Sequence, residues 1–252
     1  MQLTTCHVDD LSGPGPDRSG TPDVAVVIDV VRAFTVTPWC LARGAARVLL
    51  APSLEAAVGA RRDRWPDAVL LKDGQPDPRF QLPNSPARIA RADLVGRTVI
   101  QKTGNGTRGA FAVGAVPTVL CASFTTASAT ARAVRVASPD RVLLVPTEGD
   151  EDHALADYLT ALLDADASSP VNPEPYLARV RESAAGRECR ARGDDPAYPG
   201  VDPGDLARCL ELDVFDHALR ARPQAGLLTV GRHPTEDEIE DSIRKSPVRD
   251  RR

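Results

Sequence analysis

Short apolar runs alternate with amphipathic segments along most of this 252-residue chain, and this alternation limits the folds open to it. Within the apolar runs, polar and apolar residues do not alternate, which is typical of strands buried on both faces. Such strands, separated by helices, predict an α/β fold with three α/β/α layers around a mostly parallel or mixed central sheet. The expected strands occupy residues 23–30, 47–51, 68–72, 97–101, 117–120, 141–146 and 226–230.

The segments between the strands carry helix signals. Ser53 and Ser85 are placed to cap helices, and Pro86 suits a first helical position. Expected helices occupy residues 35–42, 54–62, 107–113, 125–137, 152–164, 175–190 and 206–221. We therefore expect an N-terminal segment over residues 1–20, a single α/β domain over 21–231 and a charged C-terminal tail over 232–252.

Composition narrows the classes of function. The 42% of hydrophobic residues can build a substantial core. A net charge of −4 gives no general attraction to nucleic acid or to an anionic membrane, and no run has the length of a membrane span. The first residues lack the basic region of a signal peptide, which favours a cytoplasmic protein with reduced cysteines. Among these thiols only Cys121, after an expected strand, merits a test as a site residue; a homodimer is left open.

One motif lies at the exit of the strand expected at residues 23–30. Asp29 ends this apolar run, and an ionised carboxylate buried there is costly without a partner. Metal ligation is one solution and an ion pair with Arg32 is the other. Val31 stands where a haloacid-dehalogenase-type phosphatase needs a second acid, which argues against an aspartyl-phosphate mechanism of that type.

A second motif follows the strand expected at residues 97–101. Backbone N–H groups of a glycine-containing turn at a helix start can cradle an anion, and flanking cations add to the hold. An Asn-Gly pair alone is also a common hairpin turn, so that alternative stays open. The pattern is not a Walker A sequence. The candidate substrate-binding residues of this run are Lys102, Thr103, Asn105, Gly106, Thr107 and Arg108.

Several polar residues follow expected strands. If the strands are parallel, Asp29, Asp73, Lys102 and Ser123 lie on one edge of the sheet, where α/β proteins bind ligands. Asn84 precedes Ser85 at a helix start, where capping alone is an equal alternative. The acids at residues 148–152 predict a solvated helix start, with a metal role as the alternative. We expect structural or solvated roles for the histidines, none of which pairs at metal-ligand spacing.

The order and spacing of four runs resemble the 2-phosphosulfolactate phosphatase family, magnesium-dependent phosphatases of coenzyme M biosynthesis. The runs are residues 27–33, 84–86, 105–108 and 123–129, and the resemblance covers roughly residues 20 to 165. It implies an α/β/α fold and hydrolysis of a phosphate ester on a small acid. By position, it implies a metal or catalytic carboxylate at Asp29, phosphate clamps at Arg32 and Arg108, and polar site groups at Asn84, Ser85, Asn105 and Thr107.

Together these patterns predict a phosphatase that acts on a small phosphorylated substrate, 2-phosphosulfolactate-like or a sugar or nucleoside phosphate. Mg2+ would be held by Asp29 with Asp73 or Asp157, while Lys102, Arg108 and the turn N–H groups stabilise phosphoryl charge. A carboxylate would orient the attacking water, or Ser85 or Ser123 would form a covalent intermediate. The candidate catalytic residues are Asp29, Arg32, Asp73, Ser85 and Ser123. A non-hydrolytic phosphate binder, and a lyase or isomerase that uses the phosphate as a handle, remain alternatives.

Overall fold

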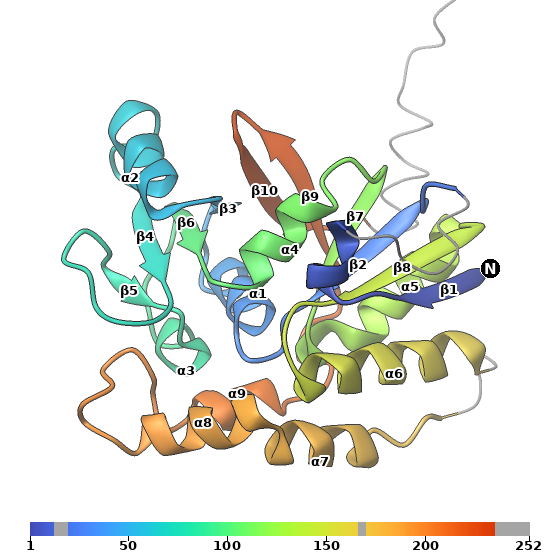
Figure 1. The fold of residues 1–252 in the computed structure, drawn as a ribbon. Helices are drawn as coiled ribbons and strands as arrows, with labels where there is room; N and C mark the ends of the chain where they lie inside the picture. The colour runs from blue at the N-terminus through green and yellow to red at the C-terminus, as the bar shows by residue number, and fades with distance from the viewer. Residues whose placement is uncertain (13–19, 166–169, 235–252) are drawn as a thin grey trace, which may run out of the picture.

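The computed structural model describes residues 1–12, 20–165 and 170–234, and within these residues a ten-stranded mixed sheet forms the centre of the fold (Figure 1). The strand order is β1-β8-β2-β7-β9-β10-β3-β6-β4-β5. The α/β fold predicted from the alternating runs is confirmed. The strands are β1 Gln2–Thr5, β2 Val24–Ile28, β3 Arg47–Leu50, β4 Val69–Lys72, β5 Leu82–Pro83, β6 Thr98–Lys102, β7 Thr118–Ala122, β8 Arg141–Pro146, β9 Leu219–Gln224 and β10 Leu227–Arg232.

The sheet contains two parallel groups of strands that run in opposite directions. The first group is β1, β8, β2 and β7, and the second is β3, β6, β4 and β5. The hairpin of β9 and β10 joins them, and its pairings with β7, within itself and with β3 are all antiparallel. Strand direction therefore reverses between the groups. Asp29 and Ser123 follow strands of the first group, whereas Asp73 and Lys102 lie at the ends of strands of the second. The expectation that all four lie on one edge assumed parallel strands throughout, and that assumption is wrong.

Helices cover both faces of the sheet. Apolar side chains of α2, α5 and α6 belong to the clusters on one face, and those of α1, α3 and α4 belong to the clusters on the other. The helical elements are η1 Val8–Ser12, α1 Ala33–Ala42, α2 Leu54–Asp63, α3 Pro86–Ile89, α4 Gly106–Ala112, η2 Phe124–Thr126, α5 Ala127–Ala137, α6 Asp150–Asp164, α7 Glu174–Glu182, α8 Ala184–Gly193 and α9 Asp205–Cys209. No helix among the described residues is long and apolar enough to cross a membrane.

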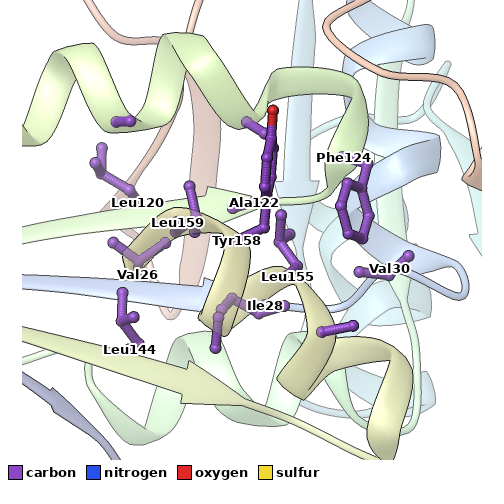
Figure 2. Packing of buried hydrophobic residues seen from close by; sticks show 14 of the residues in the cluster. Val26, Ile28, Val30, Leu120, Ala122, Phe124, Leu144, Leu155, Tyr158 and Leu159 are labelled. Carbon is purple, nitrogen blue, oxygen red and sulfur yellow. The ribbon is translucent and has the colours of Figure 1, made fainter. Parts of the chain in front are cut away.

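Strand β2 shows why the apolar runs lack a polar face. Val26 and Ile28 pack against Leu155 and Leu159 of α6 (Figure 2). Their neighbour Val27 points to the opposite face and packs with Phe34 of α1. Each fully buried aliphatic side chain stabilises the fold by about 1.5–3 kcal/mol. The uniform burial of β2 holds the residues after it in a fixed position.

Two helix caps expected from the sequence are confirmed. The Ser53 hydroxyl accepts the Ala56 N–H at 3.0 Å at the start of α2. The Ser85 hydroxyl accepts the Arg88 N–H at 3.3 Å at the start of α3, where Pro86 takes the first position. Both caps satisfy N–H groups that have no partner inside the first helical turn.

The C-terminal third departs from the sequence expectation. The helix expected at residues 206–221 is wrong, because α9 ends at Cys209 and Leu219 begins β9. Leu219 and Ala221 are buried while Arg220 and Arg222 are not, a two-residue period that suits a strand. The helix expected at 175–190 is two helices, because Ser183 ends α7 and caps α8.

The predicted domain boundaries at residues 20 and 232 remain a prediction. Strand β1 pairs with β8, so part of the N-terminal segment expected at residues 1–20 lies in the same sheet as the expected domain. Most of the charged tail expected at residues 232–252 lies outside the described residues.

Candidate active site

Asp29 follows β2 directly, and its side chain is only 7% exposed. Its Oδ1 accepts the backbone N–H of Ala33, the first residue of α1, at 2.8 Å. Gly106, the first residue of α4, approaches so closely that a Cβ there would lie 2.5 Å from Asp29 Oδ2. Asp29 therefore lies where two helices begin, and only glycine leaves room for this approach.

Two more carboxylates face Asp29. Asp73 follows β4, and its Oδ2 accepts the Gly104 N–H at 2.6 Å. Glu148 follows β8, and the Asn105 side chain hydrogen-bonds to it. We call Asp29, Asp73 and Glu148 the acidic cluster. Its members come from both parallel groups of the sheet, which the loops after the strands bring together.

The acidic cluster favours a proton or a cation. Burial raises the pKa of Asp29 to about 7, and the charges of Glu148 and Asp73 push it the same way. Hydrogen bonds from the Ala33 and Gly106 N–H groups oppose this rise only in part. Burial also raises the pKa of Glu148, to which the charges of Glu151 and Asp73 contribute. The like charges thus destabilise one another unless a positive charge joins them.

Glu151 and Asp152 lie buried behind this cluster, so the solvated helix start predicted for residues 148–152 is wrong for these two. Asp152 accepts the N–H groups of Val30, at 2.8 Å, and of Thr147 and Glu148, each at 3.0 Å. These bonds tie the loop after β2 to the loop after β8. Burial raises the pKa of Asp152 well above its ordinary range. Oε1 of Glu151 accepts the Gly149 N–H at 3.0 Å, while its Oε2 is buried without a hydrogen-bond partner among the described residues.

The turn of residues 103–107 holds the acidic cluster in place. The Thr107 hydroxyl donates to the Thr103 carbonyl at 2.6 Å, and the Thr107 N–H donates to the Thr103 hydroxyl at 3.3 Å. The Gly104 N–H is occupied by Asp73, and the Gly106 N–H hydrogen-bonds to Asp29. In the structure these N–H groups therefore hold carboxylates, where the sequence predicted that they hold phosphate.

Lys102 and Arg108, both predicted to bind the substrate, lie in different surroundings. Lys102 pairs in register with Lys72 of β4, so two of the three lysines of the chain stand at adjacent strand ends. The ammonium of Lys102 donates to the Thr103 carbonyl at 2.7 Å. Arg108 is about half exposed, and its guanidinium contacts Asp9 of η1 at 2.6 Å. This contact matches a surface ion pair and not the predicted phosphate clamp.

Arg32 and Ser85 meet at a buried carboxylate that the sequence analysis did not identify. Arg32 forms an ion pair with Asp205 of α9, and not with Asp29 as the sequence allowed. The Ser85 hydroxyl donates to Asp205 Oδ1 at 2.6 Å. We call Arg32, Ser85 and Asp205 the Asp205 junction. The hydroxyl of Ser85 is buried and donates to Asp205, which argues against the predicted nucleophilic role.

The remaining predicted site residues have other partners. The side-chain amide of Gln101 donates to Asn84 Oδ1 and to the Ala33 carbonyl, each at 3.1 Å, and so links β6 to the start of α1. Ser123 is buried, with its hydroxyl 2.7 Å from that of Thr125, which argues against a nucleophile. Asp157 is 58% exposed and pairs with Arg179 at 2.6 Å, so we leave it out of the metal site proposed below.

The cysteines are free, as expected from their spacing. Cys121 lies in β7 with its thiol buried, and burial raises its pKa far above neutral. A thiolate, the nucleophilic form, is therefore strongly disfavoured at this position. The structure does not support Cys121 as a site residue.

Glu148 and Asp205 differ in how far the sequence indicates them. Glu148 lies two residues after β8, among the acids at residues 148–152 for which the sequence leaves a metal role open, but no local pattern distinguishes it from its acidic neighbours. Asp205 carries no such signal, because it lies 173 residues after Arg32 in a loop-rich segment. The contact of His7 with the Glu148 carbonyl at 2.9 Å has no sequence signal either.

Comparison with known proteins identifies the family. The model of the 2-phosphosulpholactate phosphatase family matches residues 15–169, well over half of the chain. The chain belongs to this family. It is therefore an enzyme of the phosphatase class, and the resemblance seen in the sequence motifs is confirmed.

The chain is similar to several curated relatives, two of which match it over more than 80% of its length. A protein of Bacillus subtilis is 28% identical over 219 residues, which cover 83% of this chain and 92% of the relative. One from Prochlorococcus marinus is 30% identical over 238 residues, covering 84% and 93%. One from Deinococcus radiodurans is 40% identical over 161 residues, covering 59% and 66%. Each relative is named a probable 2-phosphosulfolactate phosphatase.

Proposed function

We propose that this phosphatase depends on Mg2+ and hydrolyses a small anionic phosphate ester, 2-phosphosulfolactate or a sugar or nucleoside phosphate of similar size. The observation that carries the proposal is the acidic cluster, in which a buried carboxylate faces two others at the start of two helices. A divalent cation would supply the positive charge that the buried carboxylate of Asp29 lacks, and it would offset the repulsion from Glu148 and Asp73. The names of the relatives support the phosphate ester as substrate.

The carboxylates of the site suit a magnesium ion that takes only some of its ligands from the protein. Within the described parts of the chain, no three His, Cys, Asp or Glu side chains come together closely enough to hold a metal ion on their own. Mg2+ is usually bound through one or two carboxylates, with waters and substrate phosphate oxygens as the other ligands. We therefore assign Asp29 and Asp73 as the protein ligands. Bound there, Mg2+ would neutralise charge on the phosphoryl oxygens.

The other residues have separate roles in this proposal. The Gly104 N–H orients Asp73, and the Gly106 N–H orients Asp29. Lys102 supplies positive charge at the end of β6, the strand that pairs with β4 just before Asp73. Glu148 accepts the proton of the attacking water as the water oxygen bonds to phosphorus, and the P–O bond to the ester oxygen breaks. The ester oxygen takes up a proton from solvent and leaves as the alcohol. The hydrogen bond from Asn105 holds the Glu148 carboxylate for this step.

Phosphate release from a panel of small esters tests the function. The panel contains 2-phosphosulfolactate, 2-phospholactate, a sugar phosphate and a nucleoside monophosphate, each assayed in EDTA and with added Mg2+. We expect release with Mg2+ and almost none in EDTA. Equal release in both conditions would overturn the magnesium assignment, and no release from any ester would overturn the proposed substrate class.

A further inference from the structure

We propose that Asp205 is a positioning residue of the active site, which orients Arg32 for contact with the phosphate group. This inference rests on the proposed function. Asp205 lies beyond residues 15–169, the part of the chain that the family model matches. The assignment would make the C-terminal third of the chain part of the site.

The carboxylate of Asp205 joins three separate segments. Its side chain has no exposed surface, and both of its oxygens accept hydrogen bonds. Oδ2 pairs with the Arg32 guanidinium and accepts the Asp202 N–H at 2.9 Å. Oδ1 accepts the Ser85 hydroxyl at 2.6 Å and the Ala87 N–H at 3.1 Å. Two of the motifs that resemble the family, at residues 27–33 and 84–86, are thus fixed to one carboxylate.

The junction is also close to the acidic cluster. Arg32 stands three residues after Asp29, between β2 and the start of α1. Arg32 Nη1 donates to the Gly200 carbonyl at 3.2 Å. A Cβ on Gly200 would lie 3.0 Å from the carbonyl oxygen of Gly74, the residue that follows Asp73. The segment that Arg32 contacts therefore packs against the loop that carries a member of the acidic cluster.

The contacts of Arg32 explain why it needs a positioning partner. An arginine side chain has several rotatable bonds, and ordering it costs up to about 2 kcal/mol of conformational entropy. The pair with Asp205 and the bond from Arg32 Nη1 to the Gly200 carbonyl at 3.2 Å order the side chain before a ligand arrives. A guanidinium held in this way can present its remaining N–H groups to a phosphate oxygen without a further loss of freedom.

The test compares Asp205→Asn with Asp202→Asn, a matched control from the same turn. Asn keeps an acceptor oxygen for Ser85 and Ala87 but removes the charge that holds Arg32. Asp202 pairs with Arg91 at 2.7 Å instead. The inhibition constant of inorganic phosphate is measured for each variant, in the wild-type background and in an Arg32→Gln background, after circular dichroism has shown that each protein is folded.

We expect Asp205→Asn to weaken phosphate inhibition about tenfold, the effect of losing one charge-assisted contact. It should have almost no further effect once Arg32 is Gln, and Asp202→Asn should have almost none in either background. An unchanged inhibition constant in Asp205→Asn, or an equal loss in both backgrounds, would overturn the positioning role. If Asp205→Asn does not fold, Asp205→Glu carries the same test, because it keeps the charge but displaces it by one methylene. A wild-type protein that neither binds phosphate nor releases it from esters would instead overturn the proposed function.

Discussion

Asp29 of the acidic cluster and Asp205 of the Asp205 junction are both buried carboxylates, yet their surroundings are opposite. Asp205 faces a guanidinium, a hydroxyl and two backbone N–H groups. Asp29 faces Asp73 and Glu148, with only backbone N–H groups to oppose them. A buried charge with complete partners can be part of the architecture, whereas one set against like charges is a candidate site for a cation or a proton.

The strongest expected difference between the two carboxylates is in folding stability. Replacing Asp205 by Ala leaves Arg32 as an uncompensated buried charge, which should lower the free energy of unfolding by about 3–5 kcal/mol. Urea unfolding monitored by circular dichroism measures this. The control is Asp157→Ala, which removes an exposed ion pair with Arg179 and should cost at most about 1 kcal/mol. Similar losses in the two variants would contradict the distinction.

Asp29→Asn should lower the activity without lowering the stability. The amide keeps the shape and the acceptor for the Ala33 N–H but removes the charge that a hard cation needs. We expect magnesium-dependent phosphate release to fall by at least about a hundredfold, the lower end of what one positioned catalytic group contributes. The melting temperature should stay the same or rise, because a repulsive charge is gone. Near wild-type turnover at subsaturating Mg2+ would show that Asp29 is not the metal carboxylate.

The pH dependence of stability tests the surroundings of Asp29. In the folded protein the pKa of Asp29 rises from its ordinary value of 3.8 to about 7. Between these values the folded state keeps a proton that the unfolded chain has released, so the free energy of unfolding falls as pH rises. Urea unfolding in EDTA across this range measures the decline. Asp29→Asn should reduce the slope, and an unchanged slope would show that Asp29 does not titrate in this window.

The smallest effect is expected at Arg108. Its pair with Asp9 is exposed on both sides, so Arg108→Ala should cost at most about 1 kcal/mol of stability. Because its guanidinium contacts η1, we also expect phosphate inhibition to change little. The family resemblance implies the opposite, a clamp whose loss costs about tenfold or more in affinity. Calorimetric titration of inorganic phosphate into both proteins decides between the two.

The local elements of this fold follow from short-range chemistry. The uniform apolar character of β2 requires a strand covered on both faces, and Ser53 and Ser85 supply acceptors where helices begin. The sequence around Asp29 likewise indicates a site, because a carboxylate at the exit of a buried strand needs a partner. The ordered motifs at residues 27–33, 84–86, 105–108 and 123–129 carry the resemblance to the family, which the comparisons confirm.

The partners of those motifs depend on contacts that no local pattern encodes. The hairpin of β9 and β10 reverses strand direction in the middle of the sheet, and the loops after β2, β4 and β8 still converge on Asp29. Arg32 could have paired with Asp29, three residues away, but pairs with Asp205, which lies 173 residues further along the chain. The sequence pattern indicates which residues need a partner. The identity of that partner depends on how distant segments pack, because burial and charge act through space and not along the chain.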